Sequence, residues 1–127
     1  MSGDQQLREI RGALLRLHKT LLEVERGDYE KIFGRLNSNE LLQLVVNDAQ
    51  FAWLRVISEL VVQFDELLSR DEPATETELQ ELLAQPRLLF DSPAHGEFMT
   101  KYQAALHREP SVVMAHSEVM KLLRTET

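Results

Sequence analysis

Residues 40–68 read ELLQLVVNDAQFAWLRVISELVVQFDELL, and this stretch decides the fold of the chain. Apolar residues recur in it at intervals of three and four, which is typical of one face of an α-helix. They are Leu42, Val45, Ala49, Ala52, Val56, Leu60, Phe64 and Leu67. Further apolar residues widen this face well beyond a narrow seam, so the helix needs partners on more than one side. We therefore expect one long helix at the centre of a helical bundle.

The start of this helix has a clear signature. Asn37 and Glu40 have the spacing of a capping box, in which each side chain accepts a hydrogen bond from the backbone N–H of the other residue. Gly34, just upstream, can take the left-handed conformation that ends a preceding helix. A helical hairpin is therefore predicted to turn at residues 34–38.

The remaining segments are also predicted to be helical. The first helix is expected from about Asp4 to Phe33, and the third is expected to open at Thr75 and to be kinked or interrupted near Leu82 by Pro86. A fourth helix is expected to begin at Ser92-Pro93, and a last one to run from Pro110 to about Arg124. Because short loops make neighbours antiparallel, the predicted fold is an all-α, up-down-up-down four-helix bundle. The fourth member of the bundle is expected to consist of two helices separated by a break at Pro110, so five helices are counted. All of them belong to a single domain over residues 1–127.

Composition narrows the classes of function. The 127 residues contain no cysteine and carry a net charge of −7, and residues 36–92 hold three Lys/Arg against eleven Asp/Glu. An acidic surface repels phosphate backbones, so we expect no nucleic-acid partner. No apolar run is long enough to span a membrane, and the first residues lack the features of a signal peptide. We therefore expect no membrane partner and a cytoplasmic location.

Motifs of metal and cofactor enzymes are absent. No histidine has a glutamate three residues before it, as a ferritin-type di-iron site requires, and no two histidines lie four residues apart. There is no glycine-rich phosphate loop and no Gly-x-Ser-x-Gly elbow. No cofactor and no metal are therefore expected, and the sequence favours a protein that is not an enzyme.

One group of polar residues lies on or beside the buried faces of the predicted first hairpin. If the turn centres near residue 36, residue i of the first helix faces residue 72 − i of the second. His18 then lies level with Trp53 and Arg55, Glu25 level with Asn47 and Asp48, and Tyr29 level with Gln43. A ligand-binding site is therefore one hypothesis for His18, Glu25, Asp48, Trp53, Arg55 and Glu59. The alternative is a set of structural residues, with His18 hydrogen-bonded, Trp53 filling the core and Arg55–Glu59 a surface pair.

Residues 40–68, together with HKTLLEVERGDYEKI at 18–32, resemble a group of short, all-helical bacterial proteins usually described only as uncharacterised. The likeness covers most of the chain and is most specific from Asn47-Asp48 through Arg55. It implies a bacterial, soluble, helical product and brings no activity.

Three functions remain open at this stage. The first is a non-catalytic module that acts by self-association, such as a homodimer, or by protein–protein interaction, through apolar surface left on Leu44, Val62 or the last helix. The second is a small-ligand-binding bundle with its pocket near Trp53 and Arg55. The third is an enzyme without a recognisable motif, using Asp48 or His18 for acid–base chemistry.

Overall fold

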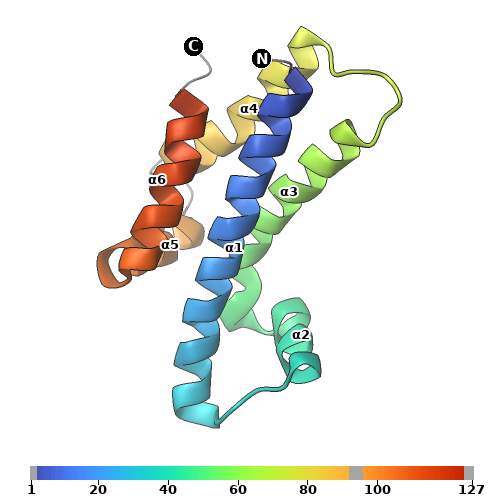
Figure 1. Cartoon of the computed structure of the whole chain (residues 1–127). Helices are drawn as coiled ribbons and strands as arrows, with labels where there is room; N and C mark the ends of the chain where they lie inside the picture. Colours follow the sequence, from blue (N-terminus) through green and yellow to red (C-terminus); the bar gives the residue numbers. More distant parts are fainter. Residues whose placement is uncertain (1–2, 92–95, 125–127) are drawn as a thin grey trace.

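The computed structural model describes residues 3–91 and 96–124, and every element in them is helical (Figure 1). In chain order the elements are α1 Gly3–Phe33, α2 Ser38–Asn47, the 3₁₀ helix η1 Ala49–Leu54, α3 Arg55–Leu68, α4 Glu76–Asp91, α5 Gly96–Arg108 and α6 Pro110–Arg124. The all-α prediction is confirmed. The expected start at Ser92-Pro93 lies outside the described residues.

The longest helix, α1, is the spine of the molecule, with α6 packed along one side and α3 along the other (Figure 1). It runs unbroken through Gly12 and Gly27, as the apolar spacing predicted. Its buried face consists of Leu7, Ile10, Ala13, Leu14, Leu17 and Leu21. Because two helices cover this face, α1 buries a wide apolar stripe along its first two thirds.

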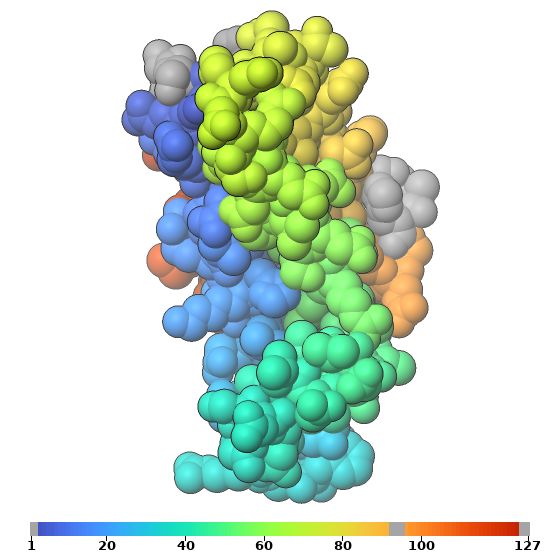
Figure 2. All heavy atoms as spheres, turned by 90° about the vertical axis from the view of Figure 1, so that its right-hand side faces the viewer, coloured from blue at the N-terminus to red at the C-terminus, as the bar shows by residue number. Residues whose placement is uncertain are grey.

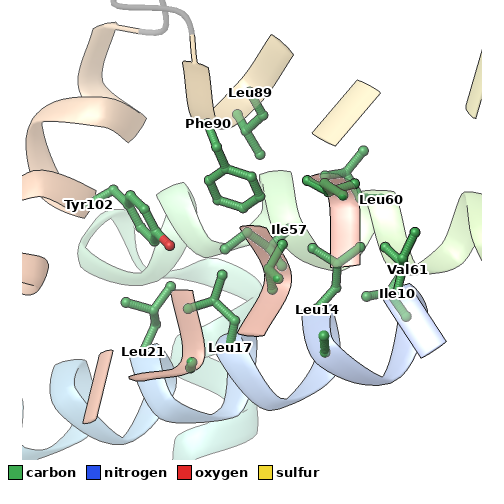
Figure 3. Packing of buried hydrophobic residues seen from close by; sticks show 14 of the residues in the cluster. Ile10, Leu14, Leu17, Leu21, Ile57, Leu60, Val61, Leu89, Phe90 and Tyr102 are labelled. Carbon is green, nitrogen blue, oxygen red and sulfur yellow. The ribbon is translucent and has the colours of Figure 1, made fainter. Parts of the chain in front are cut away.

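The core lies where α1 meets η1, α3, α4, α5 and α6, and Figure 3 shows part of it. In that view Leu14 and Leu17 of α1 point toward Ile57 of α3, with Phe90 of α4 and Tyr102 of α5 above them. All five side chains are buried. Removing these large side chains from water is the main term that holds the helices together.

The local start and stop signals are confirmed. Asn37 and Glu40 form both hydrogen bonds of a capping box. Thr75 and Glu78 form the same reciprocal pair at the start of α4. Gly34 has φ +91°, the left-handed conformation expected after a helix. However, α4 runs as one helix through Pro86, and the proline is buried against the core.

The prediction of one long helix over residues 40–68 is wrong, because the helix is interrupted at Asp48. This residue has extended backbone angles, φ −90° and ψ 138°, and separates α2 from η1. Its own N–H donates to the Leu44 carbonyl at 2.8 Å, and its Oδ1 accepts from the Gln50 N–H at 2.8 Å. The first of these is the last helical hydrogen bond of α2, and the second is the local alternative that a short polar side chain offers the backbone. The apolar spacing continues across Asp48, so periodicity could not reveal the break.

The break also changes the pairing of the first hairpin. Glu25 bonds to Gln50, with Gln50 Nε2 donating to Glu25 Oε2 at 2.9 Å, rather than lying level with Asp48. Tyr29 lies against Phe51, with ring centroids 6.1 Å apart, rather than level with Gln43. The predicted register was therefore wrong, because α1 packs on η1 and α3 while α2 turns away (Figure 1).

The last two helices, α5 and α6, do not form a single broken member of the bundle either. Tyr102 of α5 hydrogen-bonds His116 of α6, with 2.6 Å between Oη and Nδ1. Fourteen residues of straight helix would separate them by about 21 Å. The chain therefore folds back at Glu109, and Pro110 opens α6, where its fixed φ suits the first helical position. The prediction that these two helices form one bundle member was wrong, because a proline after a helix permits a reversal of the chain as well as a kink.

Candidate functional site

The structure brings two of the six predicted site residues, Glu25 and Asp48, together around Gln50 at the helix break. The side-chain amide of Gln50 donates to the Glu25 carboxylate, and its backbone N–H donates to the Asp48 carboxylate. Gln50 was missed at the sequence level because an uncharged residue within an apolar run carries no signal of its own. The Glu25 carboxylate thereby holds η1 against α1, and the Asp48 carboxylate caps the start of η1.

A third predicted residue, Arg55, reaches back across the break from the start of α3. Its Nη2 donates to the backbone carbonyl of Val46, in the last turn of α2. A guanidinium at this end of a helix satisfies a carbonyl without a helical partner and suits the negative end of the helix dipole. Arg55 therefore ties α2 to α3, and the predicted pairing with Glu59 is replaced by this backbone contact.

Trp53 lies apart from these groups, on the side of η1 that faces α5. Its ring is 4% exposed and contacts Phe98 with ring centroids 5.7 Å apart. An open cleft of about 330 Å³ adjoins it, lined by Ala52, Trp53, Val56, Leu89, Glu97 and Phe98. The buried indole Nε1 finds no hydrogen-bond acceptor among the described residues. None of the other five predicted residues lines this cleft.

His18 and Glu59 complete the predicted set. His18 is half-buried on α1, and burial lowers the pKa of its imidazole because desolvation disfavours the charged form. Glu59 is exposed on α3. In the described part of the chain, neither forms a hydrogen bond or ion pair with the other four residues. The predicted cluster is thus divided among the helix break, the Trp53 cleft and two separate positions, and its binding role stays a prediction.

A second polar group, not included in the predicted site, is the Tyr102–His116 pair. Tyr102 is 1% exposed and stacks on Phe98, and Phe90 meets the edge of the His116 ring. Burial raises the pKa of Tyr102 above its usual value. Burial, followed by the nearby Arg124, lowers the pKa of His116, and Asp91 opposes this shift. Both groups are therefore neutral near pH 7, and their hydrogen bond satisfies polar atoms within an aromatic cluster.

Figure 2 shows that α2 and the last turn of α1 form one end of the molecule, and several large apolar side chains of these two segments are exposed. We call Ile32, Phe33, Leu42 and Val46 the apolar tip. Their side chains are 74%, 67%, 58% and 57% exposed, respectively. No residue of α2 is buried, although half of its sequence, SNELLQLVVN, is Leu or Val. Exposed apolar residues gathered at one end mark a contact surface more often than scattered ones do.

Two further findings concern all the residues that the structure describes. None of the helices in the described part is both long and apolar enough to cross a membrane. Among residues 3–91 and 96–124, no three His, Asp or Glu side chains gather as they would to hold a metal ion.

Comparison with known proteins adds no family. No family model, no curated protein and no solved structure matches the chain. The expected likeness to short bacterial helical proteins therefore stays a prediction.

Proposed function

We propose that this protein is a non-catalytic helical module that acts by association, with a second copy of itself or with another protein. The observation that carries the proposal is the apolar tip. The sequence pointed to leftover apolar surface on Leu44, Val62 or the last helix, and the proposal now places the contact on Leu42 and Val46. Leu44 instead packs against the core.

The attachment of α2 supports an interaction role. Leu41, Leu44 and Val45 pack inward against the core, and Arg55 ties the end of the helix to α3. The opposite face of α2 is therefore held outward in a defined orientation. A rigid apolar face of this kind needs little reordering when a partner covers it, which lowers the entropic cost of binding.

The proposal also includes a bacterial source, which the resemblance implies, and a cytoplasmic location and no nucleic-acid partner, which the sequence pattern favours. The acidic balance of residues 36–92 supports the last of these. The arrangement of the core helices as an up-down-up-down bundle belongs to the same set of predictions.

Photo-cross-linking tests the proposal. A photoreactive amino acid replaces Leu42 in the full chain, in the cells that produce it. A matched control carries the same group at Leu88 of α4, because the two leucines are 58% and 59% exposed. We expect an adduct heavier than one chain from position 42 and none from position 88. The proposal fails if position 42 gives no adduct and the purified chain is monomeric at every concentration tested.

The second candidate function is binding of a small ligand in the cleft beside Trp53. It is favoured by the buried Nε1–H, which has no acceptor among the described residues: such a donor costs about 1–3 kcal/mol, and a ligand acceptor that reached this atom would recover that cost. Glu97 lines the cleft and disfavours anions, so we expect a neutral, largely apolar ligand with one acceptor oxygen. The indole N–H resonance of Trp53 reports binding directly. A screen of small amides and ketones that leaves this resonance and the tryptophan fluorescence unchanged would exclude the function.

A further inference from the structure

We propose that the occupant of the apolar tip is a second copy of this chain, so that α2 packs on α2 across a twofold axis. This inference rests on the association function proposed above and names its partner. Three properties of the tip support a second copy: the size of its exposed surface, the charge around it and the spacing of its residues.

The exposed area fits a homodimer of ordinary size. A large aromatic side chain buries about 150–250 Å² and an aliphatic one somewhat less, so the exposed fractions of the four tip residues amount to roughly 450 Å². A stable interface buries roughly 800 Å² on each partner, a little over half of it apolar, which is again roughly 450 Å². The tip therefore supplies the apolar part of one interface, and the polar residues of α2 supply its rim.

The charge of the tip allows a second copy to dock without repulsion. Residues 29–47 hold Glu30 and Glu40 against Lys31 and Arg35, so this end is neutral in a chain with net charge −7. Residues 65–81 hold seven Asp/Glu against one Arg, and they lie at the opposite end of the molecule (Figure 1). The 31-residue α1 spans about 46 Å between these ends. Two copies joined at their tips therefore keep their acidic ends several screening lengths apart.

The spacing within α2 suits a twofold axis. Asn39, Leu42, Gln43 and Val46 are all exposed and follow helical steps of three and four, so they share its outer face. Leu42 and Val46 lie one helical turn apart. When two copies of α2 run antiparallel, Leu42 of each meets Val46 of the other, which is the self-complementary pairing of a twofold interface. Ile32 and Phe33, on the adjoining end of α1, extend the covered surface.

The test is the mass of the full chain in solution, measured by sedimentation equilibrium from about 1 to 300 µM, a range that covers micromolar dissociation constants. Four single variants are compared with the wild type. L42E and V46E place a carboxylate in the proposed interface. L88E and V62E are matched controls on α4 and α3, with Leu88 59% and Val62 52% exposed against 58% and 57% at Leu42 and Val46. Helix content by circular dichroism checks that each variant is folded.

We expect the wild type to approach twice the 14.7 kDa of one chain as concentration rises. L42E and V46E should each raise the dimer dissociation constant at least about tenfold, because a carboxylate buried against apolar side chains loses its hydration. L88E and V62E should behave as the wild type. The constant should change little with salt, because the interface is neutral.

Two results would overturn the inference. A dimer that L42E and V46E leave intact would show that the tip is not the interface, although self-association would stand. A chain that stays monomeric up to the highest concentration would exclude a second copy as the occupant. The cross-link from position 42 to another protein would then decide the association function separately.

Discussion

Substituting Asp48 with alanine tests whether this residue creates the break between α2 and η1. The Asp48 carboxylate accepts the Gln50 N–H at 2.8 Å, and no other acceptor is shown for that N–H. Alanine removes this bond and leaves the N–H at the start of η1 without a side-chain acceptor. Loss of a capping side chain of this kind costs about 1 kcal/mol, within a range of about 0.5–2 kcal/mol.

Urea denaturation followed by circular dichroism measures this cost. With a denaturant slope of about 1.5 kcal/mol per M, a loss of about 1 kcal/mol lowers the unfolding midpoint by roughly 0.7 M. All samples are held at one chain concentration, so that any self-association contributes equally. Fluorescence of Trp53, five residues beyond the substitution, gives an independent reading of the same transition.

The matched control is D71A, because Asp71 is an exposed residue of the α3–α4 connection and shows no hydrogen bond in the described structure. Its midpoint should stay within about 0.3 M of the wild type, as expected of a surface substitution. A D48A protein as stable as the wild type, or one with more helix, would refute the reasoning. In that case the break would be imposed by packing of α2, and the Asp48 cap would be its consequence.

Three further predictions concern the Tyr102–His116 pair, the contact of Arg55 with Val46, and the two half-buried histidines. Y102F removes the hydroxyl that bonds His116 at 2.6 Å and should lower the free energy of unfolding by about 1–1.5 kcal/mol. Y29F, at a half-buried tyrosine that forms no side-chain hydrogen bond with the described residues, should change it by less than about 0.5 kcal/mol. R55M keeps the length of the side chain but loses the bond to the Val46 carbonyl, so amide exchange in α2 should accelerate several-fold while exchange in α1 is unchanged; equal protection of α2 in both proteins would contradict this. Burial lowers the pKa of His18 and His116 below the usual 6.5, so the folded chain favours their neutral forms. The stability that the neutral histidines contribute should therefore be present above pH 6.5, and it should be lost as the pH drops below that value. Urea midpoints at pH 7.5 and pH 5 should therefore differ less in H18Q/H116Q than in the wild type, and equal differences would show that other groups cause the slope.

Much of the local structure could be predicted because its cause is local. The capping boxes at Asn37–Glu40 and Thr75–Glu78 each depend on two side chains three residues apart, and both are present. The left-handed turn at Gly34 depends on one residue without a Cβ atom. The boundaries of α1 follow from a long apolar repeat with a glycine stop behind it.

The candidate site was harder to predict because it depends on which helices meet. Residue spacing placed Trp53 and Arg55 at one level of a hairpin, but they point to different neighbours, α5 and the end of α2. Glu25 and Asp48 do come together, but through Gln50, which no charge or motif marked. The apolar tip was missed for a related reason. A periodic apolar face predicts burial, and only the final packing shows that the outer residues of α2 are left uncovered.

The all-helical class and the ends of most helices were encoded in short segments, since hydrogen bonds and caps join residues within one turn of each other. The direction of α2, the reversal between α5 and α6 and the exposure of Leu42 and Val46 were decided only in the folded chain. Each depends on competition among apolar faces for a limited core, in which α1 is covered by α3 and α6 and has no room left for α2. A single sequence records which faces are apolar, but not which of them loses that competition.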